Sequence, residues 1–353
     1  MVKPLASIII NNYNYAQFIA QAIDSALSQT YPNTEVIVVD DGSTDNSVEI
    51  VASYGDLIVP VLKKNGGQGS ALNAGFQVSH GAIVIFLDAD DYLFPHAVEQ
   101  VVAAWEPGVA KVQYRLELVD AQGNFLDLYP APEISFDSGE VLPILLEKGC
   151  YESAVTSGNA FCRAALDKIL PIPEAEFRLC ADGYLVTLVP FYGKIVSIEQ
   201  ALGAYRKHGS NLWSSSDNGL KVNKFRRSLD HDFLKYKFLK SKATELGCLV
   251  PDDLGLRDRR HLTERIVSLR LDPHNHPISS DSRLLLSYKG YSAICKYSNF
   301  NWKRKLLLSN WFLWVGLMPL FLAKPAINWL YNSISRPPMI NFLLKKLRSL
   351  SYR

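Results

Sequence analysis

The sequence predicts an α/β protein with a mainly parallel sheet flanked by helices, a mixed annex and a helical C-terminal extension. Four short segments rich in β-branched residues are largely apolar, which is typical of strands buried on both faces. Segments with helical periodicity separate them, so that strand and helix alternate at roughly 25-residue spacing. Polar and acidic residues directly follow several of these strands, where an open parallel sheet binds its ligands.

The first part of the chain supplies the alternating elements. The expected strands are Ala6–Ile10, Glu35–Val39, Leu57–Leu62 and Ala82–Leu87. The expected helices lie between Ile19 and Leu27, around Val48, Ile50 and Val51, and around Leu72 and Phe76. We expect Ser43 or Thr44 to cap the second of these helices, because short hydroxyl side chains satisfy the free N–H groups of a helix start.

The pattern changes from Lys111 onward. Lys111–Val119 alternates, and residues 120–124 read as a turn into another strand, so a mixed or antiparallel annex is expected. Lys221–Lys242 and Arg259–Leu271 have a charged, helical pattern, and the chain from Asn301 is apolar and basic. We therefore predict three parts, at residues 1–218, 219–300 and 301–353.

Composition excludes several classes of protein. With 353 residues, 48% hydrophobic and 20% charged, the chain is neither disordered nor collagen-like. Its five cysteines include no CxxC pair, which argues against a zinc site or a disulfide framework and favours the cytosol. The start of the sequence has no secretory segment, so we expect a cytoplasmic location.

The net charge of +2 conceals an asymmetry along the chain. From Arg283 to the C-terminus there are twelve Lys and Arg and no Asp or Glu, which leaves residues 1–282 with a net charge of −10. The acidic body argues against nucleic-acid binding. The basic tail indicates an anionic partner, such as a membrane surface.

Three polar clusters stand at predicted strand ends: Asn11–Asn14, Asp40-Asp41, and Asp88-Ala89-Asp90-Asp91. Asp88 and Asp90 can face one crevice, and with Asp91 they crowd three negative charges together. Such crowding favours a hard divalent cation, Mg²⁺ or Mn²⁺, of the kind that also binds substrate phosphates. The alternative is a solvated turn in which Asp91 caps a helix beginning near Pro95.

Several motifs are absent. The sequence has no GxxxxGK[ST], no GxSxG and no HExxH, and the first strand–helix turn has no glycine. Gly67-Gln68-Gly69 begins a dinucleotide fingerprint, but Leu72 stands at its third glycine. These absences argue against NTPase, serine hydrolase, zinc protease and oxidoreductase functions.

Four segments resemble glycosyltransferase family 2 and occur in that family's order and spacing. They are Ser7–Asn14, Val38–Asp45, Asn65–Gly75 and Phe86–Asp91. The similarity covers about residues 4–215. It implies a GT-A fold, a nucleotide-sugar donor that we expect to be UDP-linked, and an inverting mechanism.

The resemblance also implies roles for individual residues. Asn11, Tyr13 and Asp41 would hold the base and ribose of the nucleotide, and the loop from Asn65 to Gly69 would lie near it. Asp88 would contact the ribose or the metal region, and Asp90 would bind the metal on the diphosphate. Leu72 departs from the family, where many relatives have a basic residue, so that Arg206 would supply part of the missing charge.

Two later segments fit the same family. In Cys180–Tyr184 the resemblance makes Asp182 the catalytic base, although Ala181 replaces the usual glutamate. Asp182 as a helix N-cap is the alternative. In Tyr205–Asn211, Arg206 would face the diphosphate, and His208 would bind the metal or serve a structural role. Thr156–Phe161 and Trp213 would lie beside the acceptor.

Two other functions are left open. One is a non-catalytic nucleotide-sugar binding module, and the other is a nucleotidyltransferase on a related fold. The set of Asp88, Asp90, Asp182 and His208 argues against the first, and the absence of a glycine-rich basic loop after the first strand argues against the second. The expected acceptor is a glycan or a lipid-linked molecule.

The tail is expected to associate with the inner face of the cell membrane. Leu306–Ala323 has 18 residues without charge, at the lower limit for a bilayer span, and Pro319 interrupts it. Tryptophans flank the segment, and residues 339–350 show a basic amphipathic pattern. We predict peripheral, in-plane or re-entrant attachment. The alternatives are a single membrane span and a buried helical hairpin.

Overall fold

The computed structural model describes residues 3–209, 222–298, 300–331 and 337. Trp213 and the amphipathic pattern at 339–350 lie outside the described residues. The chain divides into two compact units, which we describe separately. The first comprises Met1–Leu142 and Tyr151–Ser216, and the second comprises Pro143–Cys150 and Asp217–Arg353.

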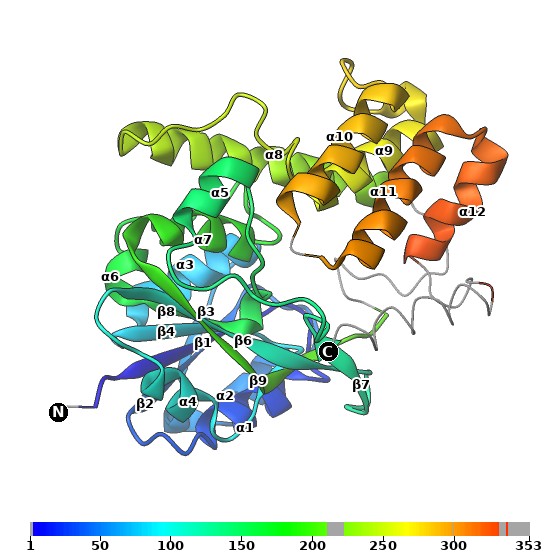
Figure 1. Ribbon diagram of the computed structural model, residues 1–353. Coiled ribbons are helices and arrows are strands. Elements are labelled where there is room, and N and C mark those ends of the chain that lie inside the picture. Colours follow the sequence, from blue (N-terminus) through cyan, green and yellow to red (C-terminus); the bar gives the residue numbers. More distant parts are fainter. Residues whose placement is uncertain (1–2, 210–221, 299, 332–336, 338–353) are drawn as a thin grey trace. The chain divides into compact units, whose positions relative to one another are not determined.

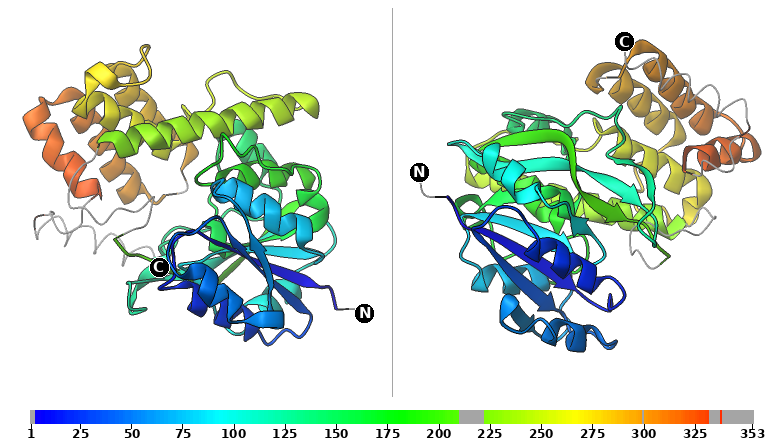
Figure 2. Two further views of the ribbon diagram at one scale, coloured as in Figure 1. Left: turned by 180° about the vertical axis from the view of Figure 1, so that it is seen from behind. Right: turned by 90° about the horizontal axis from the view of Figure 1, so that it is seen from below.

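The first unit is built on a mixed sheet with helices on both faces (Figures 1 and 2). The described residues form nine strands, in the order β3-β2-β1-β4-β8-β6-β9-β5, with β7 beside β6. The strands are β1 (Ala6–Asn12), β2 (Thr34–Asp40), β3 (Val59–Leu62), β4 (Ile83–Asp88), β5 (Tyr92–Leu93), β6 (Val109–Val119), β7 (Phe125–Tyr129), β8 (Asn159–Cys162) and β9 (Lys194–Arg206).

The sheet has a parallel half and a mixed half. β1 runs parallel to both β2 and β4, and β2 runs parallel to β3. β8 joins β4 to β6 by antiparallel pairing on both sides, while β6 and β9 are parallel. The predicted parallel sheet with a mixed annex is therefore confirmed.

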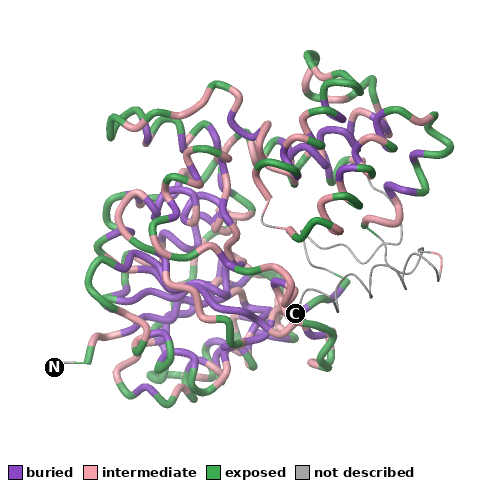
Figure 3. The backbone as a smooth tube through the Cα atoms, viewed as in Figure 1, coloured by how far each residue is buried: buried purple, intermediate pink, exposed green. Residues whose placement is uncertain are grey.

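Burial explains why these segments form strands. The apolar runs of β1 and β4 are buried, and Figure 3 shows the central strands as the buried core of this unit. β3 is exposed along most of its length and contains Pro60, as suits an edge strand that lacks a neighbour on one side. The predicted strand at Leu57 starts later because Gly55–Leu57 forms a short 3-10 helix.

The helices of the first unit are short. They are α1 (Ile19–Leu27), α2 (Ser47–Ala52), α3 (Gln68–Val78), α4 (Ala97–Ala103), α6 (Arg163–Leu166) and α7 (Asp182–Leu188). The predicted cap of α2 is wrong. Asp45 accepts the hydrogen bond from the Ser47 N–H at 3.1 Å, whereas the Ser43 hydroxyl accepts from the Asn14 N–H at 2.9 Å.

The second unit is helical. Its elements are α5 (Leu142–Lys148), which starts at the boundary, α8 (Val222–Glu245), α9 (Arg259–Leu271), α10 (Arg283–Tyr297), α11 (Trp302–Leu317) and α12 (Leu320–Tyr331). Asp258, Ser282 and Asn301 cap α9, α10 and α11 through their side chains. The bounds of α9 are those predicted from the sequence.

The predicted boundary near residue 300 does not separate two cores. Ile266 of α9, Ile294 of α10, Phe312 of α11 and Ile327 of α12 belong to one buried cluster. α10 and α11 approach closely at Gly290, where an added Cβ would lie 2.1 Å from the Phe312 ring. The segment from Trp302 to Tyr331 thus completes the helical core, which corresponds to the hairpin alternative.

α11 and α12 are separated at Met318 and Pro319, in keeping with the predicted break at that proline. None of the helices in the described part of the chain combines the length and apolar character needed to cross a bilayer.

Glu264 makes the stability of the helical unit depend on pH. Burial and then the charge of Asp232 raise its pKa from 4.5 to about 8. Between these pH values the folded state keeps a proton that the unfolded state releases, so the free energy of unfolding falls as the pH rises. Glu264→Gln removes the ionisable group and with it this loss of stability at high pH. The variant should therefore be more stable than wild type at pH 8 by roughly 1–3 kcal/mol, with little change at pH 4.

Urea unfolding across this pH range measures the effect. Glu245→Gln is the matched control, because the Glu245 side chain at the end of α8 is 58% exposed. Equal pH dependence in wild type and Glu264→Gln would contradict the prediction.

Candidate active site

The carboxyl ends of β1, β2 and β4 form the edge that carries the polar clusters. The strand register pairs Asn11 with Asp88 and Asn12 with Asp40. The Asn11 amide donates to Asp88 Oδ1 at 3.0 Å, and the Asn12 amide donates to Asp40 Oδ2 at 2.8 Å. The side chains predicted to meet at this edge therefore do so, and Tyr13 beside them is 46% exposed.

Asp41 holds the loop that precedes α3. Its Oδ1 accepts from Lys63 Nζ at 2.6 Å and from the Gly66 N–H at 2.9 Å, and its Oδ2 accepts from the Gly67 N–H at 2.6 Å. Gly67 has a φ of 89°, and a Cβ there would lie 2.4 Å from the Arg178 side chain. Asn65 in the same loop accepts from the Arg178 guanidinium.

The carboxylates after β4 have different surroundings. Asp90 Oδ2 lies 2.9 Å from His208 Nε2, and both residues are buried. Asp91 accepts from the Ser157 hydroxyl at 2.6 Å and from the Arg206 N–H at 2.9 Å. Asp91 therefore fixes the loop from inside. It does not cap a helix near Pro95, because α4 starts at Ala97 after His96.

Crowding and burial change the acidity of this cluster. Burial, followed by the charge of Asp90, raises the pKa of Asp88 from 3.8 to about 7. Burial and the charges of Asp90 and Asp88 hold the pKa of Asp91 well above its ordinary value. The site therefore favours a cation or a proton, as the predicted repulsion requires.

Two aromatic rings pack against His208. The ring of Phe18 lies 4.9 Å from the imidazole and that of Tyr15 lies 5.6 Å from it, both measured between ring centroids. Burial, together with the charges of Asp90, Asp88 and Asp91, raises the pKa of the Tyr15 phenol. These contacts keep His208 beside Asp90.

Arg206 lies beneath the carboxylate loop. Its Nε donates to the Asp90 carbonyl at 2.9 Å, Nη1 to the Ala121 carbonyl at 3.0 Å, and Nη2 to Gln21 Oε1 at 2.6 Å. These contacts position the loop. The diphosphate contact expected from the sequence stays a prediction.

Asp182 is the first residue of α7, and Ala181 occupies the N-cap position without a side-chain cap. The N-cap alternative for Asp182 is therefore wrong. The charge of Asp182 contributes to the raised pKa of Asp88 and also acts on Lys111. Asp182 thus lies within electrostatic range of the strand-end cluster.

Gln68 joins these parts of the site. Its Nε2 donates to Asp88 Oδ1 at 2.9 Å, and its Oε1 accepts from the Ala181 N–H at 2.9 Å. One side chain therefore links the Asp88 carboxylate to the start of the Asp182 helix. Only its place between two glycines could have drawn attention to it in the sequence.

We expect Gln68→Ala to lower kcat for donor turnover roughly 10- to 100-fold, because small displacements of catalytic groups have effects of this size. Steady-state kinetics measures the change, with the exposed Gln122→Ala as control. Equal kcat values for wild type and Gln68→Ala would show that this link does not position the site.

The stretch Thr156–Phe161, expected beside the acceptor, is buried along its whole length. Ser157 binds Asp91 and also accepts from the Asp88 N–H at 3.1 Å. Asn159 donates to the Val155 carbonyl at 2.6 Å. This stretch supports the carboxylate loop from inside, and the structure does not place it at an acceptor surface.

The residues that could hold a metal are Asp90 and His208. Among the described residues there is no group of three or more His, Cys, Asp or Glu side chains arranged to bind a metal ion. A carboxylate and an imidazole within 2.9 Å fit a divalent ion whose remaining ligands are water and substrate oxygens.

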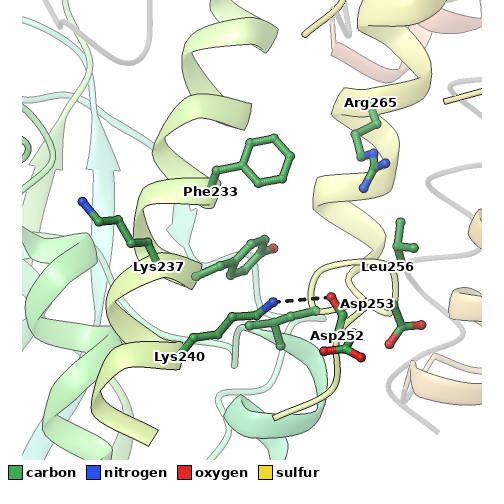
Figure 4. Close-up of a pocket in the computed structure, with 9 residues that line it drawn as sticks. Phe233, Lys237, Lys240, Asp252, Asp253, Leu256 and Arg265 are labelled. Atoms are coloured by element: carbon green, nitrogen blue, oxygen red, sulfur yellow. Dashed lines mark hydrogen bonds between the residues drawn. The ribbon is translucent and has the colours of Figure 1, made fainter. Parts of the chain in front are cut away.

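A cavity of about 360 Å³ lies in the helical unit, lined by α8, by the loop that precedes α9 and by Arg265 of α9. Figure 4 shows Phe233, Lys237 and Lys240 of α8 on one side and Arg265 on the other. The Arg265 guanidinium is already bound by Asp281. Lys240 donates to the Asp252 carbonyl at 3.4 Å. These contacts suggest no acid–base chemistry.

Part of the chain is similar to known glycosyltransferases. Residues 7–131 match the model of "Glycosyl transferase family 2". An uncharacterized glycosyltransferase from Nostoc sp. (strain PCC 7120 / SAG 25.82 / UTEX 2576) is 38% identical over 212 residues, which are 58% of this chain and 65% of that protein. An uncharacterized glycosyltransferase from Rickettsia bellii (strain RML369-C) is 43% identical over 232 residues, 60% of this chain and 33% of that protein.

Two solved structures share the fold at low identity. TarS 1–349 of S. aureus in complex with UDP-GlcNAc has a TM-score of 0.50 and 15% identity, covering 94% of this chain and 90% of that one. The mannosyltransferase PcManGT from Pyrobaculum calidifontis, in complex with GDP-Man and Mn²⁺, has a TM-score of 0.50 and 17% identity, covering 95% and 87%.

The mixed sheet with flanking helices defines a protein of the GT-A class of folds. Within it, residues 7–131 are similar to glycosyl transferase family 2, whose model they match. The chain spans 65% of the length of the Nostoc relative and 33% of that of the Rickettsia bellii relative.

Proposed function

We propose that the chain is an inverting glycosyltransferase that moves a sugar from a nucleotide-sugar donor, UDP-linked in our expectation, to a glycan or lipid-linked acceptor. The observation that carries this proposal is the link through Gln68 between the Asp88 carboxylate and the start of the Asp182 helix. It joins a predicted donor-binding group to the predicted base.

The donor would lie along the ends of β1, β2 and β4. Asn11, Asp41, Asn65 and Asp88 supply polar groups for the nucleoside, and the half-exposed ring of Tyr13 supplies a stacking surface. Support for this class of donor comes from TarS and PcManGT, which were solved with UDP-GlcNAc and GDP-Man.

Asp90 and His208 would hold Mg²⁺ or Mn²⁺, and PcManGT was solved with Mn²⁺. When bound, the ion neutralises charge that develops on the leaving diphosphate. Arg206 and Asp91 contribute by holding the loop in place, and the rings of Phe18 and Tyr15 pack against the imidazole.

The transfer itself needs one base. Asp182 accepts the proton of the acceptor hydroxyl as its oxygen bonds to the anomeric carbon. The bond between that carbon and the diphosphate oxygen breaks on the opposite face, and the nucleoside diphosphate leaves with the electron pair. A single displacement of this kind inverts the anomeric configuration.

Product analysis tests this function. Wild-type protein is incubated with a panel of UDP- and GDP-sugars plus Mn²⁺, with water as acceptor, and nucleotides are separated by chromatography. Release of nucleoside diphosphate, with inversion seen by NMR, is expected. In a parallel incubation with UTP or GTP and a sugar 1-phosphate, release of pyrophosphate would instead indicate nucleotidyl transfer. Donor binding without turnover would indicate a binding module.

We further propose that the helical unit docks peripherally on an anionic, cytoplasmic membrane surface. Trp302 is 70% exposed and Phe321 is 73% exposed, although both belong to helices that also line the core. Every ionised side chain from Arg283 onward is basic. Each such residue near an anionic leaflet contributes about 1 kcal/mol to binding, and interfacial aromatics add to it.

Co-sedimentation of the full chain with vesicles is expected to show binding to phosphatidylserine-containing vesicles that high salt reverses. The double variant Trp302→Ser/Phe321→Ser should lower the bound fraction several-fold. Leu249→Ser, which alters a 94% exposed leucine outside the basic segment, is the control. Truncation before α11 is unsuitable because it would open the shared core. No binding by wild type in low salt would overturn this proposal.

A further inference from the structure

The stretch from Gly66 to Gly69 contains three glycines at the start of α3, a composition typical of loops whose free backbone N–H groups hold a phosphate. In this protein the four N–H groups of the stretch are already bound. The first two donate to Asp41, at 2.9 and 2.6 Å, and the last two donate to the carbonyls of Arg178 and Phe177, at 2.8 and 3.1 Å. A phosphate beside this loop therefore needs another donor.

Arg178 contacts this loop from the segment that precedes Asp182. Its carbonyl accepts from the Gln68 N–H, and its side chain lies against Gly67, where an added Cβ would be 2.4 Å from Arg178 Cγ and 3.0 Å from Arg178 Cα. The guanidinium then reaches Asn65, whose side-chain oxygen accepts from Arg178 Nη2. Contacts of the backbone and of the side chain thus fix the guanidinium at the loop.

The charge of Arg178 is not neutralised within the part of the chain that the structure describes, where no carboxylate forms an ion pair with it. Its partner Asn65 is a neutral amide, and Arg178 is exposed to solvent. In contrast, Lys63 is paired with Asp41 at 2.6 Å, and Arg206 is only 2% exposed and donates to protein oxygens through three nitrogens. Of these three cations, Arg178 is the one whose charge is available to an anionic ligand.

Gln68 connects this cation to the candidate donor site. Its backbone N–H binds the Arg178 carbonyl, while its side-chain amide binds Asp88 and the Ala181 N–H. The site is otherwise rich in carboxylates, which repel a diphosphate unless cations lie beside it. A planar guanidinium is suited to this role, because it can donate two parallel N–H bonds to phosphate oxygens.

We propose that Arg178 is a substrate-binding residue whose guanidinium holds the diphosphate of the nucleotide-sugar donor. The inference rests on the proposed function, because it assigns a residue to the donor of that reaction. As the bond between the anomeric carbon and the diphosphate oxygen breaks, the guanidinium also neutralises part of the charge that develops on the leaving group.

Arg178→Met tests the proposal by calorimetric titration in the presence of Mn²⁺. The first probe is UDP, or GDP where product analysis identifies a guanosine-linked donor, and the second probe is the matching nucleoside without phosphates. We expect the variant to bind the diphosphate about 10- to 100-fold more weakly than wild type, because hydrogen bonds to charged groups have effects of this size. Binding of the nucleoside, measured by saturation-transfer NMR, should be unchanged.

Two further variants accompany this measurement. Methionine keeps an aliphatic chain over Gly67, whereas Arg178→Lys keeps the charge without the planar fork and should bind the diphosphate more tightly than Arg178→Met. Lys194→Met is the matched control, because Lys194 is an exposed cation at the start of β9. Since β9 runs in the same direction as β4, Lys194 lies at the opposite edge of the sheet from Asp88, and this variant should bind both probes like wild type.

The two probes separate a contact with phosphate from a structural role. Equal loss of diphosphate and nucleoside binding in Arg178→Met would overturn the proposal, because it would mean that Arg178 acts by holding Asn65 in place. Unchanged diphosphate binding would overturn it as well. Failure of wild type to bind either UDP or GDP would instead overturn the proposed function, and the assignment of Arg178 with it.

Discussion

Replacing Asp182 with Asn is expected to lower donor turnover at least ~10²-fold, because a positioned general base contributes 10² to 10⁴ in rate. Donor affinity should stay nearly unchanged, since the base acts on the acceptor hydroxyl and not on the nucleotide. Steady-state release of nucleoside diphosphate measures turnover. Calorimetric titration with the nucleoside diphosphate alone, which cannot react, measures binding of the nucleotide part of the donor.

The substitution should change the fold little. Asp182 is the first residue of α7, where loss of a negative charge lowers stability by about 0.3–1 kcal/mol. Asp167→Asn, at an exposed position after α6, is the control with the same change in charge. Loss of nucleotide binding by Asp182→Asn would contradict the assignment and make Asp182 part of the donor or metal site.

The strand-end edge could be predicted from the sequence because the evidence for it is local. A continuous apolar run such as Ile83–Leu87 defines a buried strand, and the acidic residues after it must then stand at its carboxyl end. The bounds of α9 followed from periodicity and from Asp258 immediately before it. Both predictions use only short-range information.

The internal connections of the site could not be predicted in this way. Asp91 turns inward because Ser157, in the 3-10 turn before β8, and the Arg206 N–H, at the end of β9, both donate to it. Gln68 is recognisable as part of the site only when the fold brings Asp88 at the end of β4 and Ala181 at the start of α7 to the two ends of its amide group. Partners so distant along the chain leave no periodic signal.

The C-terminal segment shows the limit of hydropathy. The pattern at Leu306–Ala323 is equally apolar whether its partner is lipid or protein. Phe312 and Val315 are buried in the helical core, while Leu306 and Trp314 stay exposed on the same helix. A helix that buries one apolar face in the core and leaves the other exposed therefore resembles a membrane segment in sequence. Only the folded structure distinguishes the two faces.

Replacing Asp90 with Asn is expected to abolish metal-dependent turnover while the protein still folds. Asp90 and His208 are the side chains proposed to hold the ion, and an amide is a weak ligand for Mg²⁺ or Mn²⁺ beside a carboxylate. Asn is preferred to Ala here because it keeps a hydrogen-bonding group 2.9 Å from His208 Nε2 in place of the Asp90 oxygen. Turnover is measured with Mn²⁺ and in excess chelator.

Stability provides the independent measurement. The negative charge of Asp90 contributes to the raised pKa of both Asp88 and Asp91. Removing that charge makes ionisation of these two groups less unfavourable in the folded state, and this change favours the folded state above pH 7. Without metal, Asp90→Asn should therefore unfold at a temperature no lower than wild type at pH 8. With Mn²⁺ and UDP, the melting temperature of wild type should rise and that of Asp90→Asn should not. Full activity of wild type in excess chelator, or equal Mn²⁺-induced shifts in both proteins, would contradict the metal role, because each result would mean that the ion does not act through Asp90.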